Sequence, residues 1–506
     1  MFICGYKLVR RLKLFIVHYH LRPGGVRRVL EMAAPHLVRR LGGSIALVVG
    51  ETPDAAWLRG FRRRVAPAKV EVFVDAALGY VEAGTSKGRE ERVRGALRSA
   101  LGGEGIVWAH NLALGRNLFL ARQLAALCAE RGLRLVAHHH DWWCDHRWAR
   151  WAELRRGGFR TLRAVAAAVF PTASVVTHVA INRADAAILR RHFPGRAHWL
   201  PNLVERGAGA PSIARRAPVW LMPCRVLRRK NIAEALLLTR WLRPEARLVI
   251  TGGADETDEL PYARALQAAA REHRWPVEFG AIPRGADVGG LLARCEAVVF
   301  TSIQEGFGLP ALEAAAAGRP LIARRVPLVA ADLDTFGFRF PQAYDEVLVD
   351  PALFDWRAEV RRQTALWRDW RSHLPHTVRT FAGTPILLAS RRTPRPIPFS
   401  RLTLTAQLEV LSQPVEESWT QCAPLNPILP QWRERAAQAA LKVSPWPARA
   451  EQWLSGAAYA RRFAEIARAT SDQTMTEPCA VAAQAEFIRA RLDPAQMFPL
   501  LFSTRT

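Results

Sequence analysis

The sequence predicts an α/β protein with two doubly wound parallel sheets and a mainly helical C-terminal extension. Short apolar runs of β type alternate with amphipathic helical patterns over residues 1–205 and again over residues 206–340. This alternation is typical of parallel βαβ units. From residue 341 it ends, and the pattern becomes helical and rich in Trp, Arg and Pro. We therefore expect two Rossmann-like domains, 1–205 and 206–340, followed by an extension over 341–506.

The expected elements follow from these runs. Strands are predicted in the first domain at residues 14–17, 45–49, 70–74, 106–109, 133–137 and 175–181. In the second domain they are predicted at residues 219–222, 246–250, 277–279 and 297–301. Helices are predicted at residues 26–41, 118–131, 401–411, 431–442, 449–470 and 481–492. Residues 207–218, which contain Ala, Gly and Pro, predict a hinge between the domains.

Composition narrows the class of protein. Half of the 506 residues are hydrophobic, which excludes a disordered chain, and no apolar run reaches the ~18 residues of a membrane span. The early apolar run at 12–17 is interrupted by Lys13 and lacks a small-residue cleavage site, so we expect a first strand rather than a signal peptide. Seven dispersed cysteines without a CxxC pair indicate reduced thiols and a cytoplasmic location.

The formal charge is +27, and only six of the 72 basic residues are lysines. Two explanations stay open: a coding bias toward arginine, or a surface for a phosphorylated ligand, an anionic membrane or a nucleic acid. The arginines are spread along the chain, and neither a helix-turn-helix nor an RNP-like motif is present. We therefore expect no nucleic-acid partner.

The most informative motif follows the strand predicted at 297–301. Two carboxylates, Glu305 and Glu313, stand eight positions apart, and the residues between them begin with Gly306, Phe307, Gly308 and Leu309. The glycines let a ligand approach the backbone, and the free amides of the following helix face an anion. Because one Glu lies on the loop and the other about two turns into the helix, both can accept hydrogen bonds from sugar or ribose hydroxyls.

A cationic loop follows the strand predicted at 219–222. Arg225 and Lys230 stand five positions apart in it. Arginine offers a bidentate fork and lysine a point charge, and fixed cations of this kind stabilise a diphosphate as it leaves. By itself, a basic run is more often solvated surface, and its pairing with the two carboxylates favours an anion site.

Together, these two motifs resemble those of the family 4 (group 1) retaining glycosyltransferases of GT-B fold. The resemblance covers roughly residues 12–335, in matching order. It implies that Arg225 and Lys230 hold the donor diphosphate and that Gly252 lies beside the nucleotide. It also implies that Glu305 faces the transferred sugar. One departure is Asn231, where the family usually has glycine after the lysine.

The first domain carries the acceptor-side candidates. Gly24 and Gly25 lie between the first strand and the first helix, and the resemblance implies contact with acceptor or donor phosphate there. Asn111 follows the strand predicted at 106–109. A polar cluster at 138–146 follows the strand predicted at 133–137, and the resemblance places the family's reaction-centre histidine at His140. Asp141 can orient that histidine or bind hydroxyls.

Three features of this region have more than one interpretation. Trp142 can stack on a sugar ring or pack in the core. The cluster contains metal-ligand types, but neighbouring histidines on a strand point to opposite faces, so we expect no metal site. Residues 147–163 mix arginines with aromatic residues at roughly helical spacing, which fits either an anionic membrane surface or a solvated helix face.

The expected function is that of a retaining, metal-independent hexosyltransferase without a cofactor, cytoplasmic or peripheral at the inner membrane face. It would move sugar from a UDP- or GDP-linked donor to a hydroxyl acceptor. That acceptor would be a membrane-associated saccharide or lipid, or a small polyol or glycerate-type compound. The alternatives are a basic nucleic-acid-binding protein and a catalytically inactive GT-B scaffold. The intact set of Arg225, Lys230, Glu305 and Glu313 argues against an inactive scaffold.

Overall fold

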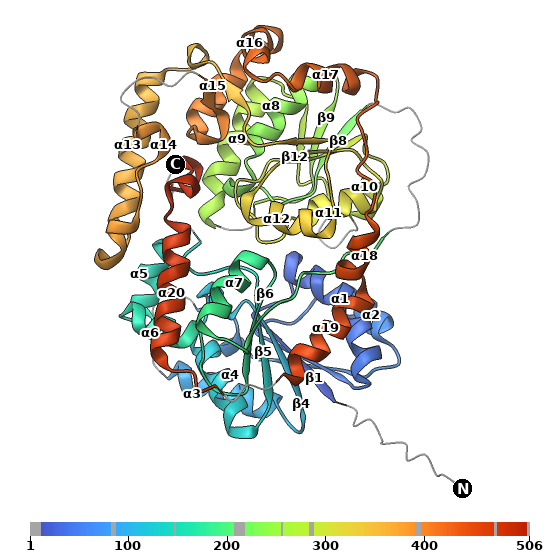
Figure 1. Ribbon diagram of the computed structural model, residues 1–506, viewed down its shortest axis with the longest axis vertical. Helices are drawn as coiled ribbons and strands as arrows, with labels where there is room; N and C mark the ends of the chain where they lie inside the picture. Colours follow the sequence, from blue (N-terminus) through green and yellow to red (C-terminus); the bar gives the residue numbers. More distant parts are fainter. Residues whose placement is uncertain are drawn as a thin grey trace. The chain divides into compact units, whose positions relative to one another are not determined.

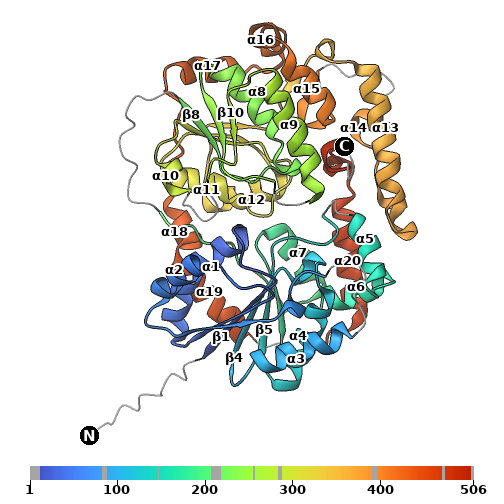
Figure 2. The same ribbon diagram turned by 180° about the vertical axis from the view of Figure 1, so that it is seen from behind.

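The computed structural model forms two compact units (Figures 1 and 2). Unit 1 comprises Met1–Glu205 and Glu451–Ile488, and unit 2 comprises Arg206–Ala450 and Arg489–Thr506. The structure describes residues 12–81, 88–145, 148–206, 218–254, 257–282, 288–389, 396–469 and 473–502. The expected hinge lies outside these residues except for Pro218, and so does His146 of the polar cluster. No helix within the described ranges is both long and apolar enough to cross a membrane.

Unit 1 is built on a seven-stranded sheet in the order β3-β2-β1-β4-β5-β6-β7, with all neighbours parallel. Its strands are β1 (Lys13–His18), β2 (Ile45–Val49), β3 (Val70–Val74), β4 (Gly105–His110), β5 (Arg134–His139), β6 (Val176–Ala180) and β7 (Ala197–Trp199). The strand order reverses between β1 and β4. Ligands of such sheets bind beyond the carboxyl ends of the strands at that point.

Helices cover both faces of this sheet (Figure 1). They include α1 (Gly25–Leu41), α2 (Ala55–Val65), α3 (Arg89–Ala100), α4 (Leu118–Arg131), α5 (Ala149–Arg156), α6 (Leu162–Val169) and α7 (Arg183–His192). Two more come from the C-terminal extension, α19 (Gly456–Arg468) and α20 (Glu477–Arg491). Helix α19 packs along α1 and against β5, so part of the extension completes the first unit.

Unit 2 repeats the design with six parallel strands in the order β10-β9-β8-β11-β12-β13. They are β8 (Val219–Met222), β9 (Arg247–Ile250), β10 (Val277–Phe279), β11 (Ala297–Phe300), β12 (Leu321–Arg324) and β13 (Gln342–Tyr344). The order reverses between β8 and β11, whose loops carry the two main motifs. The intervening helices include α8 (Ile232–Leu242), α9 (Leu260–Glu272), α10 (Gly289–Leu292), α11 (Leu309–Ala316) and α12 (Pro327–Phe336).

The rest of the extension packs onto unit 2 and shares its core. It contains α13 (Trp356–Ser372), α14 (Ile386–Ala389), α15 (Leu404–Ser412), α16 (Val415–Cys422), α17 (Leu429–Ala437), α21 (Pro499–Phe502) and the antiparallel pair β14 (Leu348–Val349) and β15 (Ile397–Pro398). Helices α15, α16 and α17 cover α8. Trp241 of α8 and Val410 of α15 belong to one continuous hydrophobic cluster. Residues 341–506 are therefore divided between the two units. The helix expected at 449–470 is two helices, α18 (Ala448–Leu454) and α19, separated at Ser455.

One glycine at the carboxyl edge of the first sheet tests this packing. A Cβ on Gly50 would lie 2.2 Å from the backbone nitrogen of Gly79 and 2.7 Å from the carbonyl oxygen of Tyr19. Because backbone atoms cannot swing aside, Gly50→Ala should lower the free energy of unfolding by about 1–3 kcal/mol. Gly60 in α2 faces open space, so Gly60→Ala should raise it by roughly 0.5–1 kcal/mol. Urea unfolding followed by tryptophan fluorescence compares the two, and similar effects would contradict the packing.

Candidate functional site

In unit 2, the loops after β8 and β9 are joined by backbone hydrogen bonds. The amide of Gly252 donates to the carbonyl of Cys224 at 2.9 Å, and the amide of Val226 donates to the carbonyl of Gly253 at 3.1 Å. A Cβ on Gly252 would lie 3.0 Å from Cγ of Arg225. The glycine thus lets the second loop lie directly against the arginine. Predicted site residues from two loops are therefore neighbours.

The loops after β8 and β11 meet in a buried ion pair. Lys230 Nζ donates to Glu305 Oε1, and Arg229 Nη1 lies 3.3 Å from Glu305 Oε2. Ser302 Oγ also donates to Oε1, at 2.7 Å. Burial alone would raise the pKa of Glu305, but the two cations and the Ser302 hydroxyl lower it below its usual value. The carboxylate is therefore ionised at neutral pH.

Arg229 was not among the predicted site residues. It stands in the basic run beside Lys230, and that position is the only sequence signal it carries. Its backbone is also held, because the amide of Ile303 donates to its carbonyl at 2.9 Å. The structure thus surrounds Glu305 with two cations.

The glycine loop ends where α11 begins. Gly308 precedes the helix with φ 77°, and a Cβ there would lie 2.7 Å from Val329 Cγ1, so both backbone conformation and space require glycine. Phe307 is buried and its ring packs edge-on against Phe336. Any contribution of Phe307 to donor binding is therefore through its backbone. Glu313 lies on α11 and is partly buried, one turn from the start of the helix rather than the two turns expected.

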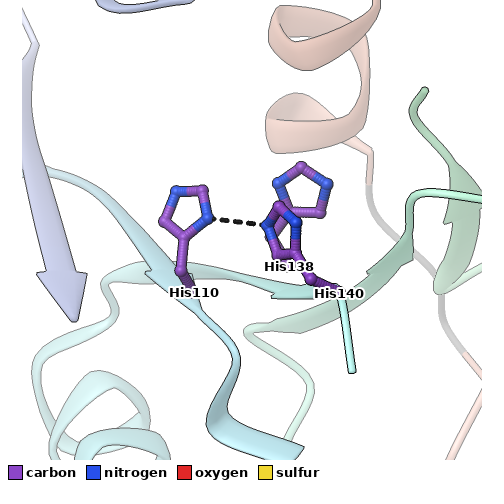
Figure 3. Close-up of side chains that lie close together, drawn as sticks. All are labelled: His110, His138 and His140. Atoms are coloured by element: carbon purple, nitrogen blue, oxygen red, sulfur yellow. Dashed lines mark hydrogen bonds between the residues drawn. The ribbon is translucent and has the colours of Figure 1, made fainter. Parts of the chain in front are cut away.

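In unit 1, three histidines meet at the carboxyl ends of β4 and β5 (Figure 3). His110 Nδ1 lies 3.0 Å from His140 Nε2, and one ring nitrogen from each of His110, His138 and His140 lies within 4.8 Å of the others. His138 and His140 are two positions apart, so they share one side of the extended backbone. His139 points to the other side, where its Nε2 lies 3.2 Å from His178 Nδ1. The expectation of divergent histidines holds only for His139.

Asn111 fixes the turn that carries His140. It adopts a left-handed conformation, with φ 57°, at the end of β4. Its Oδ1 accepts hydrogen bonds from the backbone amides of His140, at 2.8 Å, and Asp141, at 3.0 Å. Its Nδ2 donates to Asp141 Oδ2 at 3.3 Å. Because the side chain is buried and both its oxygen and its amide nitrogen bond to these neighbours, Asn111 positions them rather than facing an acceptor.

Residues 210–332 match the profile of the family described as "Glycosyl transferases group 1". This range contains both loops of the buried ion pair. Over this range the second unit is similar to the group 1 glycosyltransferases. The match agrees with the resemblance seen in the sequence, and its range includes the two motifs that the structure brings together.

The chain is also similar to parts of two curated proteins. The chain is 21% identical over 343 residues to mannosylglucosyl-3-phosphoglycerate synthase of Petrotoga mobilis, covering 62% of this chain and 65% of that protein. It is 30% identical over 107 residues to N,N'-diacetylbacillosaminyl-diphospho-undecaprenol alpha-1,3-N-acetylgalactosaminyltransferase of Campylobacter jejuni, covering 21% and 26%. The matched region thus spans less than two thirds of either relative.

Two solved structures are similar in fold to most of this chain. HepE of Anabaena, crystallised with UDP-glucose, superposes with a TM-score of 0.52 at 16% identity, covering 90% of this chain and 98% of HepE. Sucrose-phosphate synthase of Thermosynechococcus elongatus superposes with a TM-score of 0.50 at 14% identity, with the same coverage. The predicted fold class, two Rossmann-like sheets of GT-B type with a helical extension, is confirmed.

The histidine cluster does not fit a three-histidine metal site. Trp108 Nε1 donates to His138 Nδ1 at 3.2 Å, which places the proton of the neutral His138 ring on Nε2. That nitrogen then offers a proton and not a lone pair. A metal-bound histidine normally donates its other N–H to an acceptor, and here a donor occupies that place. Only His110 and His140 remain, and two ligands do not make a protein metal site of the usual kind.

Trp142 lies in the interior of unit 1. It is 2% exposed, its ring centroid lies 4.0 Å from that of Phe487, and its indole N–H donates to Asp185 Oδ2 at 2.9 Å. Packing therefore occupies this ring, and we withdraw its assignment to the acceptor side. Gly24 and Gly25, by contrast, lie at the start of α1 as expected, and a Cβ on Gly25 would meet nothing within 4 Å.

In the described part of this segment, 148–163, the large aromatic and aliphatic side chains do not form an exposed face for a membrane. Four of them are buried in unit 1, namely Trp148, Trp151, Leu154 and Phe159. Its exposed side chains include Arg155, Arg156 and Arg160. The interpretation as a solvated basic helix face therefore fits the structure, and the membrane interpretation loses this support.

Six buried histidines of unit 1 predict acid sensitivity. Burial is the largest cause of a lowered pKa in each: it is about 3 for His18, about 4 for His140 and His178, and well below the usual value for His110, His138 and His139. Below pH ~6.5 these histidines therefore become protonated in the unfolded chain, while they stay neutral in the folded chain. The contribution of these histidines to the free energy of unfolding is fully present above that pH. It falls as the pH drops toward 4, by up to about 1.4 kcal/mol per pH unit for each histidine.

The measurement is urea unfolding of the whole chain between pH 7.5 and 5.5, where carboxylates of ordinary pKa stay ionised. His178→Gln should reduce the pH slope by about one proton, because it removes one of these groups. A stability that does not change over this range would contradict the neutral, buried state of the cluster.

Proposed function

We propose that the protein is a retaining glycosyltransferase that moves a sugar from a nucleoside diphosphate sugar to a hydroxyl acceptor. The supporting observation is the contact between Lys230 and Glu305. It joins two motifs 75 positions apart at the point where strand order reverses. A cation for the diphosphate and a carboxylate for the sugar therefore lie side by side, as adjacent groups of one donor would need them.

In this proposal, Arg225 and Lys230 neutralise the diphosphate while the glycosidic bond breaks. Fixed cations in a site with little water stabilise the charge that develops on the leaving group. Glu305 faces the transferred sugar, and Glu313 on α11 faces the ribose. Gly252, Gly306, Gly308 and Leu309 supply backbone contacts. Since these cations belong to the chain, the reaction requires no metal ion.

His140 of unit 1 is proposed to be the histidine that contacts the transferred sugar. Its pKa is lowered to about 4, mainly by burial, so its ring is neutral at pH 7 and can donate or accept a hydrogen bond. Gly24 and Asp141 are proposed on the acceptor side, and Gly25 is proposed to bind the donor. The names of the two relatives support either a phosphoglycerate-type or a lipid-linked saccharide acceptor, and the donor is proposed as UDP- or GDP-linked. We propose a cytoplasmic protein that contacts an anionic membrane only peripherally.

Removing the cation of the ion pair should abolish nucleotide binding. Lys230→Met leaves Glu305 ionised and short of one partner, which costs stability as well. The double variant Lys230→Met/Glu305→Gln replaces both members of the pair by neutral side chains, so Lys230 and Glu305 do not leave each other unpaired. We expect both variants to lose transfer by about 10²–10³-fold or more.

The assay screens UDP, GDP and ADP by thermal shift and then their sugars for transfer, with EDTA present throughout. Lys442→Met is the matched control, because this lysine is exposed and uses only backbone atoms in its bonds to Gln342. Normal turnover in the double variant would remove the donor site from this loop.

The two carboxylates should separate in steady-state kinetics. Glu305→Gln should lower kcat, because Glu305 can stabilise the positive charge that develops on the sugar in the transition state. Glu313→Gln should mainly raise KM, because a ribose contact is equally strong in the ground and transition states. If Glu305→Gln changed only KM while Glu313→Gln destroyed kcat, the two roles would be exchanged. If neither variant differed from wild type, the glycosyltransferase proposal would fail.

A further inference from the structure

Asn231 is the residue through which the C-terminal extension reaches the cationic loop. It follows Lys230 directly and is fully buried in a left-handed conformation, with φ 49° and ψ 56°. For a residue with a Cβ this conformation costs about 1–2 kcal/mol, and asparagine tolerates it best. Something in the surroundings must therefore hold it there.

The side chain of Asn231 is held at both ends. Its Nδ2 donates to Glu234 Oε2 at 2.9 Å, and its Oδ1 accepts from Gln407 Nε2 at 3.2 Å. Gln407 lies on α15 of the extension and is fully buried. Its Nε2 also donates to the carbonyl of Phe399, at 3.1 Å. Both protons of this amide are therefore used, which fixes its position.

The backbone on the other side of Lys230 is held by the end of β11. Thr301 Oγ1 lies 3.0 Å from the carbonyl oxygens of both Lys230 and Asn231. The amide of Lys230 donates to the carbonyl of Leu227 at 2.9 Å. Helix α21, near the end of the chain, packs against the single turn formed by Arg228–Lys230. The loop is thus enclosed by one strand of the sheet and two helices of the extension.

The partner of Asn231 continues this network. Glu234 accepts from Tyr344 at 2.6 Å and from Arg324, whose guanidinium also contacts Glu346 at 2.7 Å. Glu346 in turn accepts from Ser400 Oγ at 2.6 Å. All of these bonds lie within unit 2. Buried hydrogen bonds of this kind fix the geometry of the residues they join, although Oε1 of Gln407 has no hydrogen-bond partner among the described residues.

We propose that Gln407 is a positioning residue for Lys230, and that this part of the extension serves to hold the diphosphate-binding loop in place. The inference rests on the proposed function. Gln407 itself touches no ligand and acts through Asn231. Three consecutive cations at 228–230 repel one another, so a loop that presents Lys230 in a fixed place needs anchors of this kind.

The test uses Gln407→Met, which keeps the volume of the side chain and removes its hydrogen bonds. The matched control is Gln363→Met, because Gln363 is an equally buried glutamine of the extension whose amide bonds to Glu359 and the carbonyl of Arg401. Calorimetry measures binding of UDP and of UMP to the full-length wild type and both variants. The ratio of the two affinities measures how much the second phosphate contributes to binding. A general loss of stability does not change this ratio.

We expect Gln407→Met to weaken UDP binding by about tenfold, the loss of one or two buried hydrogen bonds, and UMP binding by less than about twofold. Gln363→Met should leave the ratio unchanged. Glycine at position 231 would adopt φ 49° freely and has no side chain for Gln407 to bond. In the Asn231→Gly background, Gln407→Met should therefore leave the UDP-to-UMP ratio unchanged. An unchanged UDP-to-UMP ratio in Gln407→Met, or an equal change in Gln363→Met, would overturn the inference. If the wild type bound none of UDP, GDP and ADP, the proposed function would fail instead.

Discussion

The buried pair of Lys230 and Glu305 is the constraint on which the rest of unit 2 depends. Moving two charges out of water costs several kcal/mol per ion, and their attraction offsets this cost only when geometry and further hydrogen bonds are good. Here, Arg229 and Ser302 supply those additional partners to the carboxylate. The loops after β8 and β11 must therefore stay in contact, because separating them would leave a charge buried without its partner.

This constraint also bears on how the pair would meet a ligand under the proposed function. A lysine held by a carboxylate is already desolvated and oriented before any ligand arrives, so little reorganisation is needed when a phosphate takes its charge. An arriving diphosphate would have to share or displace the contact with Glu305. That exchange would leave the carboxylate available to a neighbouring group of the same ligand. Under the proposed function, one ion pair would thus link the donor phosphate and the transferred sugar.

Much of the fold follows from local sequence. The expected strands at 45–49, 70–74, 219–222 and 277–279 match β2, β3, β8 and β10 residue for residue, because each is a mainly apolar run that ends before a turn. Three strands of the two parallel sheets were not predicted. β7 is three residues long and contains His198, while β12 and β13 are short runs that include Arg324 and Gln342. Short strands with polar residues lack the pattern that sequence reasoning depends on.

The candidate site also has parts that the sequence could predict and parts that it could not. The convergence of Lys230 and Glu305 was predictable, since parallel strands place their following loops at one edge of a sheet. The burial of Trp142 was not, because it depends on Phe487, which lies far along the chain on a helix that returns to unit 1. Likewise, the sequence left open which side of β5 each of three consecutive histidines would occupy relative to β4.

The departure at position 231 and the long extension have one physical explanation. A glycine there would adopt the left-handed conformation without strain, but it would have no side chain with which neighbouring elements could hold it. Asparagine accepts a backbone cost of about 1–2 kcal/mol and in return bonds to Glu234 and Gln407, which lie 3 and 176 positions away. These bonds make the backbone next to Lys230 rigid. They can form only if the buried side-chain amide of Gln407 lies beside Asn231. Residues 399–407 bring it, so the asparagine and the extension depend on each other.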